Sequence, residues 1–182
     1  MRKLLLPLMG IVFMVACNNE KPAENKEASV APATESKETP PAEFADKKFV
    51  EIASKQLDAL TAGDVDGWLN GYTDKAVYIW NNGDSLAGKK AITDYWKNRR
   101  ANVIDSITFT NRVFLPVKVN KPQSIEQPGN WVLCWYLTSA KYKTGKSMHQ
   151  WIHTDIHFDA NDKIDRLIQY VDRSLINAAS AK

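Results

Sequence analysis

The sequence predicts an α+β domain in which an antiparallel sheet has its helices gathered on one side. Two observations predict this class. Apolar residues recur at helical spacing only in the first half of the domain, and the second half consists of alternating segments joined by short turns. Since helices come first and hairpin-linked strands follow, the strands are expected to pair antiparallel with the helices packed together against them.

Apolar spacing of three and four residues marks the helices. In the first, Phe49, Ala53 and Leu57 fall on one face; in the last, Ile92 and Trp96 do so. Because each face is apolar and its opposite side polar, these helices are expected to lie on a core rather than stand free. The expected helices cover residues 45–60, 65–72 and 88–102.

Alternation of apolar and polar residues marks the strands. The alternation is unbroken from Ser147 to Phe158, and the turn residues Asn161 and Asp162 lead into the next strand. Pro116 predicts a bend in the first long strand, since proline cannot donate to a strand ladder. The expected strands cover residues 75–81, 107–119, 131–142, 147–158 and 163–172.

The two faces of the segment 147–158 differ in character. One face carries Met148, Gln150, Ile152, Thr154, Ile156 and Phe158, and the other carries His149, Trp151, His153, Asp155 and His157. The first face is more apolar, so the hydrophobic effect favours placing it inside. This choice bears on function, because imidazoles inside would line a cavity with bases, and imidazoles outside would leave the interior without one.

The polar face of this segment is also a candidate metal site. Same-face neighbours on a strand lie about 6.6 Å apart, so His153 and His157 are roughly 13 Å apart and His149 and His157 roughly 26 Å apart. Ligand bonds of roughly 2.1 Å cannot bridge such gaps, so no metal site is expected within this strand alone. A site that joins His153 and Asp155 to a ligand from another strand stays open. Trp151 makes the face a candidate subunit interface, and His153 with Asp155 stays open as a catalytic pair.

The amino terminus resembles a bacterial lipoprotein signal. Arg2 and Lys3 precede an apolar run over residues 4–16 that is too short to span a bilayer as a helix, and Cys17 follows directly. We therefore expect residues 1–16 to be removed and Cys17 to be lipidated, which holds the protein in the bacterial cell envelope, by analogy at the outer membrane. An ordinary cleaved signal with a chance cysteine is the alternative.

Composition divides the rest of the chain. Residues 18–43 hold six Glu and three Lys with no aromatic residue, so they cannot bury enough apolar surface to fold. We expect residues 17–43 to form a lipidated tether, residues 44–177 the folded domain and residues 178–182 a tail.

Charge and cysteine content exclude several partners. Without residues 1–16 the chain has 22 basic and 21 acidic side chains, a balance that favours no electrostatic partner. The basic cluster over residues 97–100 is typical of a solvated helix face, so no nucleic acid is expected. Cys134 is the only cysteine after Cys17, which leaves neither a disulfide framework nor metal-ligand spacing, and no cofactor or metal is expected.

Four segments in their order and spacing resemble the nuclear transport factor 2-like superfamily, and within it the SnoaL-like domains and ketosteroid isomerases. These segments cover residues 62–68, 72–74, 88–92 and 158–164. The resemblance implies a cone-shaped, strongly bent antiparallel sheet whose concave side carries the helices and encloses an apolar pocket, often in a dimer. Members include isomerases, cyclases, dehydratases, epoxide hydrolases and binders without chemistry, so the fold alone does not define the function.

The isomerase pattern can be carried onto this sequence residue by residue. Its aspartate base falls on Trp80, and its two oxyanion donors fall on Gln56 and Thr154. Proton abstraction beside a carbonyl needs a base, and an indole cannot serve as one. The resemblance therefore implies no isomerase chemistry of that kind.

The expected interior is aromatic and aliphatic with a few neutral polar groups, a composition that suits a hydrophobic small molecule. A solid core is the alternative. The expected lining is Gln56, Tyr78, Trp80, Trp135, Ile152, Thr154 and Gln169. The leading function is a membrane-anchored binder without catalysis. The alternatives are an isomerase, dehydratase or hydrolase that uses His153 and Asp155, and a non-catalytic module that forms a homodimer through the outer sheet face.

Overall fold

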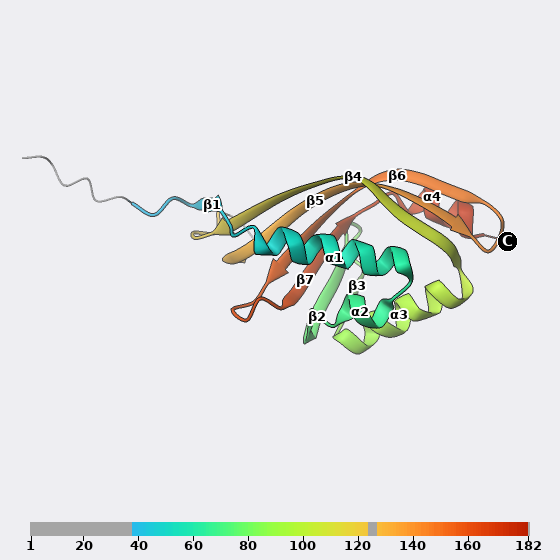
Figure 1. Cartoon of the computed structure of the whole chain (residues 1–182), viewed down its shortest axis with the longest axis horizontal. Helices are drawn as coiled ribbons and strands as arrows, with labels where there is room; N and C mark the ends of the chain where they lie inside the picture. The colour runs from blue at the N-terminus through green and yellow to red at the C-terminus, as the bar shows by residue number, and fades with distance from the viewer. Residues whose placement is uncertain (1–37, 124–126, 182) are drawn as a thin grey trace, which may run out of the picture. The chain divides into compact units, whose positions relative to one another are not determined.

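A bent seven-stranded sheet frames the domain (Figure 1). The structure is a computed structural model that describes residues 38–123 and 127–181. The strands are β1 (Ala42–Phe44), β2 (Tyr72–Trp80), β3 (Ser85–Ala87), β4 (Ile104–Val119), β5 (Gly129–Tyr142), β6 (Ser147–Phe158) and β7 (Ile164–Tyr170). Their order across the sheet is β1-β4-β5-β6-β7-β2-β3. The long strands β4, β5 and β6 form two consecutive hairpins, as the alternating segments predict.

One pairing joins the early and late parts of the chain within the sheet. All neighbouring strands run antiparallel except β2 and β7, which pair in parallel. In this pairing Tyr78 lies beside Leu167 and Trp80 lies beside Gln169, so the first long strand of the chain meets the last. The pairing brings polar residues from distant parts of the sequence to the same part of the concave face.

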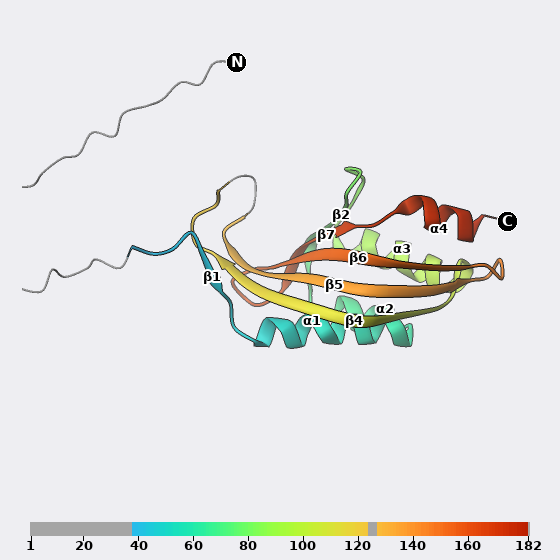
Figure 2. The same cartoon turned by 90° about the horizontal axis from the view of Figure 1, so that it is seen from above.

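The helices cover the concave side of the sheet. Figure 1 shows α1 (Lys48–Ala62), α2 (Val65–Leu69) and α3 (Lys89–Asn102) beneath the arch of β4, β5 and β6, and Figure 2 shows α4 (Arg173–Ser180) beside β6. Helix α1 ends at Gly63, whose φ of 79° is left-handed and suits glycine. The Asp64 side chain then accepts a hydrogen bond of 2.8 Å from the Gly67 amide and caps α2.

A cluster of aromatic rings joins the helices to the sheet. Trp68 of α2 is 2% exposed, and its ring centroid lies 5.3 Å from that of Tyr72, 6.5 Å from that of Tyr78 and 5.4 Å from that of Trp96. All three contacts have the edge-on geometry that aromatic quadrupoles favour. The cluster therefore fixes α2 and α3 against β2.

The expected α+β class with helices on the concave side is confirmed, but several boundaries differ. Strand β1 pairs with the end of β4 through residues 42–44, so the last part of the expected tether belongs to the fold. Helix α4 continues to Ser180 and buries Ala179, so most of the expected tail is helical. Strand β4 is irregular between Thr110 and Val113 rather than at Pro116. A bulge of this kind bends a strand.

Residues 1–37 lie outside the described residues, and with them the expected signal segment and Cys17. Within the described ranges no helix is both long and apolar enough to cross a membrane.

Candidate functional site

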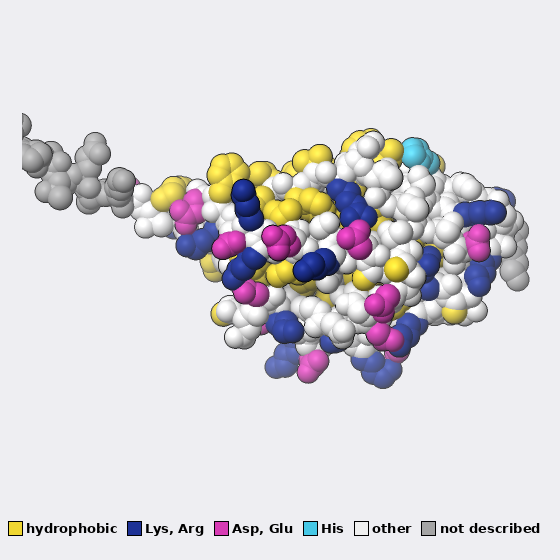
Figure 3. Space-filling view, viewed as in Figure 1, with side chains coloured by type: hydrophobic (Ala, Val, Ile, Leu, Met, Phe, Trp, Pro, Cys, Tyr) yellow, Lys and Arg dark blue, Asp and Glu magenta, His cyan; other side chains and the backbone are white. Residues whose placement is uncertain are grey.

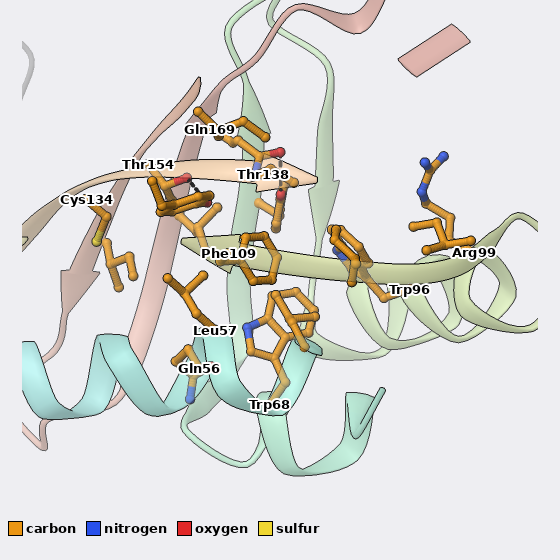
Figure 4. A pocket seen from close by; sticks show the side chains of 18 of the residues that line it. Gln56, Leu57, Trp68, Trp96, Arg99, Phe109, Cys134, Thr138, Thr154 and Gln169 are labelled. Atoms are coloured by element: carbon orange, nitrogen blue, oxygen red, sulfur yellow. Dashed lines mark hydrogen bonds between the residues drawn. The ribbon is translucent and has the colours of Figure 1, made fainter. Parts of the chain in front are cut away.

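A cavity of about 70 Å³ lies between the helices and the concave face of the sheet (Figure 4). Its walls include Leu57 of α1, Trp68 of α2, Trp96 of α3 and Ile176 of α4, together with side chains from β2 and from β4 to β7. Most of this lining is apolar because it is also the core of the domain. A buried space of this size exceeds what one water molecule needs and is smaller than the roughly 150 Å³ that can hold benzene.

Two hydrogen-bonded pairs of side chains lie on the sheet side of the cavity. The Tyr78 hydroxyl donates to Gln169 Oε1 at 2.8 Å, and the hydroxyls of Tyr136 and Thr154 lie 2.7 Å apart (Figure 4). The strand register explains this arrangement, because Thr154 of β6 lies beside Gln169 of β7. These side chains form a neutral polar band in an otherwise apolar wall.

Four other polar atoms of the lining are buried without a hydrogen-bond partner in the described part of the chain. They are Gln56 Oε1, the Tyr72 hydroxyl, Trp96 Nε1 and Thr138 Oγ1. A buried polar group without a partner costs about 1–3 kcal/mol of stability, and such groups are uncommon. The cavity therefore offers one amide acceptor, one indole donor and two hydroxyl groups to a guest molecule.

The ionisable groups of the lining are unsuited to proton transfer near neutral pH. Burial raises the pKa of Tyr136 to about 12, and it raises the pKa values of Tyr78 and of the Cys134 thiol. Among the described residues, no Asp, Glu or His lines the cavity, and Arg99 is its one charged side chain. The arrangement can hold a molecule by dispersion and hydrogen bonds, and it contains no base.

Replacing Thr138 with valine is expected to raise the free energy of unfolding by about 1 kcal/mol, because a methyl group takes the place of an unpaired hydroxyl. Thr154→Val is the matched control on the neighbouring strand. It removes the hydrogen bond between the hydroxyls of Thr154 and Tyr136 and is expected to lower stability by about 1 kcal/mol. Urea unfolding of both variants measures the contrast. Equal losses in the two variants would show that Thr138 has a partner after all.

Five of the seven residues expected in the pocket line the cavity. They are Gln56, Tyr78, Ile152, Thr154 and Gln169. Trp80 is buried but lies behind the wall, with its ring centroid 4.8 Å from that of Tyr78 and 5.4 Å from that of Tyr95.

The expected inward direction of Trp135 is wrong. Trp135 lies beside His153 in the strand register, and their ring centroids are 4.6 Å apart on the outer face. The inward residues of β5 are instead Cys134, Tyr136 and Thr138. Strand β5 is apolar on both faces, so its pattern gives no contrast from which to choose one. The register with β6 would have identified them, since inward Thr154 pairs with Cys134.

Helix residues of the lining were also missed. Trp68, Trp96 and Arg99 face the cavity, and only the apolar helix spacing could have pointed to the two tryptophans. No feature of the sequence distinguishes Arg99 from the basic residues beside it, which are turned elsewhere.

The expected inward face of β6 is confirmed. Met148, Ile152 and Ile156 are buried and line the cavity, while His149 is exposed on the opposite face. The expectation of a half-polar outer surface fails at His157, which is 5% exposed. Its Nδ1 lies 2.5 Å from Asp165 Oδ1, and its Nε2 lies 3.1 Å from the Pro128 carbonyl oxygen, so the chain before β5 covers it.

The candidate catalytic pair lies outside the cavity. His153 Nε2 is 2.7 Å from Asp155 Oδ1, and burial raises the pKa of the Asp155 carboxyl while His153 opposes that rise. Both side chains are on the outer face of β6, so an enzyme that uses them in the interior is excluded. No cluster of three or more metal-ligating residues occurs in the ranges 38–123 and 127–181.

The family model of the SnoaL-like domain matches residues 53–167. The chain belongs to the SnoaL-like family. No curated protein matches it. The match covers both the cavity wall and the outer face, and it ends within β7.

Solved structures share this SnoaL-like fold at low sequence identity. A candidate isomerase from Bacillus subtilis is 18% identical with a TM-score of 0.57, over 73% of this chain and 92% of that one. A candidate polyketide cyclase from Xanthomonas campestris is 14% identical with a TM-score of 0.60, over 74% and 98%. An NTF2-like protein of unknown function from Burkholderia pseudomallei is 10% identical with a TM-score of 0.59, over 74% and 98%. At these identities the likeness shows the fold alone.

Proposed function

We propose that this SnoaL-like domain binds a small organic molecule in its interior cavity and performs no acid–base chemistry there. The observation that carries the proposal is the composition of the lining. Its walls are apolar, four neutral polar atoms lack partners, and no described carboxylate or imidazole is present. This is the usual make-up of a site that orients a ligand through a few hydrogen bonds.

The cavity limits the size of the guest. With about 70 Å³ in its present packing, it holds a molecule of a few non-hydrogen atoms. A larger hydrophobic ligand, flat or lipid-like, would need the side chains of the lining to move apart. The proposal is therefore narrowed to short ligands.

The test is binding of short neutral compounds to wild type and to a cavity-filling variant. Ala53 lines the cavity and Ala140 is buried without lining it, so Ala53→Val and Ala140→Val form a matched pair. Saturation-transfer NMR with butyramide, butanone and butanol is expected to show binding to wild type and Ala140→Val, and a loss of about tenfold or more in Ala53→Val. Equal binding by all three proteins would place the compounds elsewhere, and no binding to wild type would refute the proposal.

A second candidate function is supported by the outer face of the sheet. Its outer-face patch consists of Val113, Trp135, Trp151 and Tyr170, which are exposed on four neighbouring strands. Figure 3 shows hydrophobic side chains gathered along the upper surface, over the sheet. Contiguous exposed apolar surface of this kind favours association. We propose that a second copy of the chain covers it through a two-fold contact.

Membrane anchoring through lipidated Cys17 and a place in the bacterial cell envelope remain proposals from the sequence. They rest on the apolar run over residues 4–16 and on the cysteine that follows it. Fatty-acid analysis of the purified protein checks them. A chain without acyl groups would exclude the anchor.

A further inference from the structure

We infer that the ligand is a short monocarboxylic acid whose carboxylate is bound by Arg99 at one end of the cavity. This rests on the proposed binding function and adds the chemical class of the ligand and the residue that recognises it. A carboxylate fits the planar fork of a guanidinium, which can donate two parallel hydrogen bonds to it.

Arg99 is placed differently from the other arginines around it. It lies in the last turn of α3 and contributes the only charge among the described residues of the lining. Arg112 and Arg173 each have an acidic partner, Asp58 at 2.6 Å and Asp84 at 2.5 Å. Within residues 38–123 and 127–181 no such ion pair involves Arg99. A cation beside a largely apolar cavity is thus left without a counter-charge.

Aromatic contacts hold this cation in position. The guanidinium carbon of Arg99 lies 5.6 Å from the centroid of the Tyr95 ring, a cation–π contact on the same helix. Arg99 also lies close enough to Tyr142, another lining residue, to oppose the rise in the pKa of that phenol caused by burial. Figure 4 shows Arg99 at one end of the lining, apart from Thr154 and Gln169. The head of a ligand at Arg99 would direct its tail along the apolar wall.

The neighbouring basic residues do not share this position. Lys97 pairs with Asp66 at 2.7 Å, and Arg100 turns towards Gly63, where an added Cβ would meet its Nη2 at 2.8 Å. Neither lines the cavity. Because one cation alone is available, a single carboxylate is favoured over a dicarboxylate, whose second charge would enter the apolar interior unpaired.

The tail of the acid must be short and mainly apolar. A cavity of about 70 Å³ accepts a few carbon atoms. The unpaired oxygens of Thr138 and Gln56 can accept a hydrogen bond from one hydroxyl or amine group on the tail. Acids of about three or four carbons meet these limits.

The test compares butyrate with butyramide, which have nearly the same shape and differ in charge. Dissociation constants at pH 7 come from NMR titration of wild type, Arg99→Gln, Arg99→Lys and Lys97→Gln. We expect wild type to bind butyrate at least about tenfold more tightly than butyramide, as a charge-assisted pair implies. Arg99→Gln should abolish this ratio and leave butyramide binding within about twofold. Lys97→Gln, which removes the same charge from the same helix, should preserve the ratio.

Each outcome decides between the two proposals. Equal affinity for acid and amide in wild type, or a preference for butyrate that persists in Arg99→Gln, overturns the role of Arg99 and leaves the binding cavity standing. Failure of both compounds to bind wild type overturns the binding function together with this inference. If Arg99→Gln does not fold, Arg99→Lys decides, because it keeps the charge without the fork and should retain part of the preference for butyrate.

Discussion

Replacing Trp68 with alanine is expected to lower the free energy of unfolding by about 3–5 kcal/mol. Trp68 is almost fully buried, and its ring contacts Tyr72 and Tyr78 of β2 and Trp96 of α3. The short helix α2 that carries it has few other buried residues to replace these contacts. The loss therefore combines the transfer of an indole to water with the void that it leaves beside an existing cavity.

Denaturant unfolding followed by circular dichroism measures this loss, with Leu175→Ala as the control. Leu175 is an apolar residue of α4 that is 43% exposed, and its truncation is expected to change stability by less than about 1 kcal/mol. A loss below about 1 kcal/mol for Trp68→Ala would mean that the aromatic cluster does not join the helices to β2.

Replacing Trp151 with glutamate is expected to weaken self-association by about a thousandfold. Trp151 is 55% exposed in the outer-face patch, and a two-fold contact through this patch would bring two copies of any substitution into one interface. Tryptophans buried in interfaces are frequent hot spots that contribute about 2 kcal/mol or more, and a carboxylate in such a place loses the apolar contact and adds the cost of desolvating a charge. Two such losses make the effect larger than that of an ordinary surface change.

Sedimentation velocity over a range of protein concentrations measures the association of wild type and variant. Leu175→Glu serves as the control, because it places the same charge on an exposed apolar residue outside the outer-face patch. We expect Leu175→Glu to associate as wild type does. A wild-type protein that stays monomeric up to about 100 µM would exclude the proposed dimer.

Strand β6 and strand β5 show how far the sequence predicts the site. In β6 one face is oily and the other carries imidazoles, so the direction of Thr154 and Ile152 follows from the hydrophobic effect alone. In β5 Leu133 and Trp135 on the outside are as apolar as Cys134 and Tyr136 on the inside. A choice between such faces needs the pairing register, which comes from long-range contacts and not from local pattern.

Sequence patterns could not predict the two short strands or the cavity, for a different reason. Strands β1 and β3 have three residues each, too few to show a period of two. The volume of the interior depends on how the rings of Trp68, Tyr78 and Trp96 pack, and residue types alone do not determine rotamers. The sequence likewise could not predict that the Thr138 hydroxyl lacks a hydrogen-bond partner, because this depends on which side chains surround it.

The polar row of β6 illustrates the same limit on the outer face. His149, His153 and His157 have the same strand parity, yet their burial rises along the strand from exposed to almost complete. The difference comes from residues 127–129, which reach over His157 and accept its hydrogen bond through the Pro128 carbonyl. Covering segments of this kind are set by loop geometry and not by alternation.

The burial of Cys134 makes the rate at which its thiol reacts a measure of how often the cavity opens. Its thiol lines the cavity, and its raised pKa keeps the unreactive protonated form while the walls are closed. An alkylating reagent can modify this sulfur only while the cavity is transiently open to solvent. The rate of modification therefore reports how often the cavity opens. A resident guest that holds the walls together should slow that labelling in proportion to its occupancy.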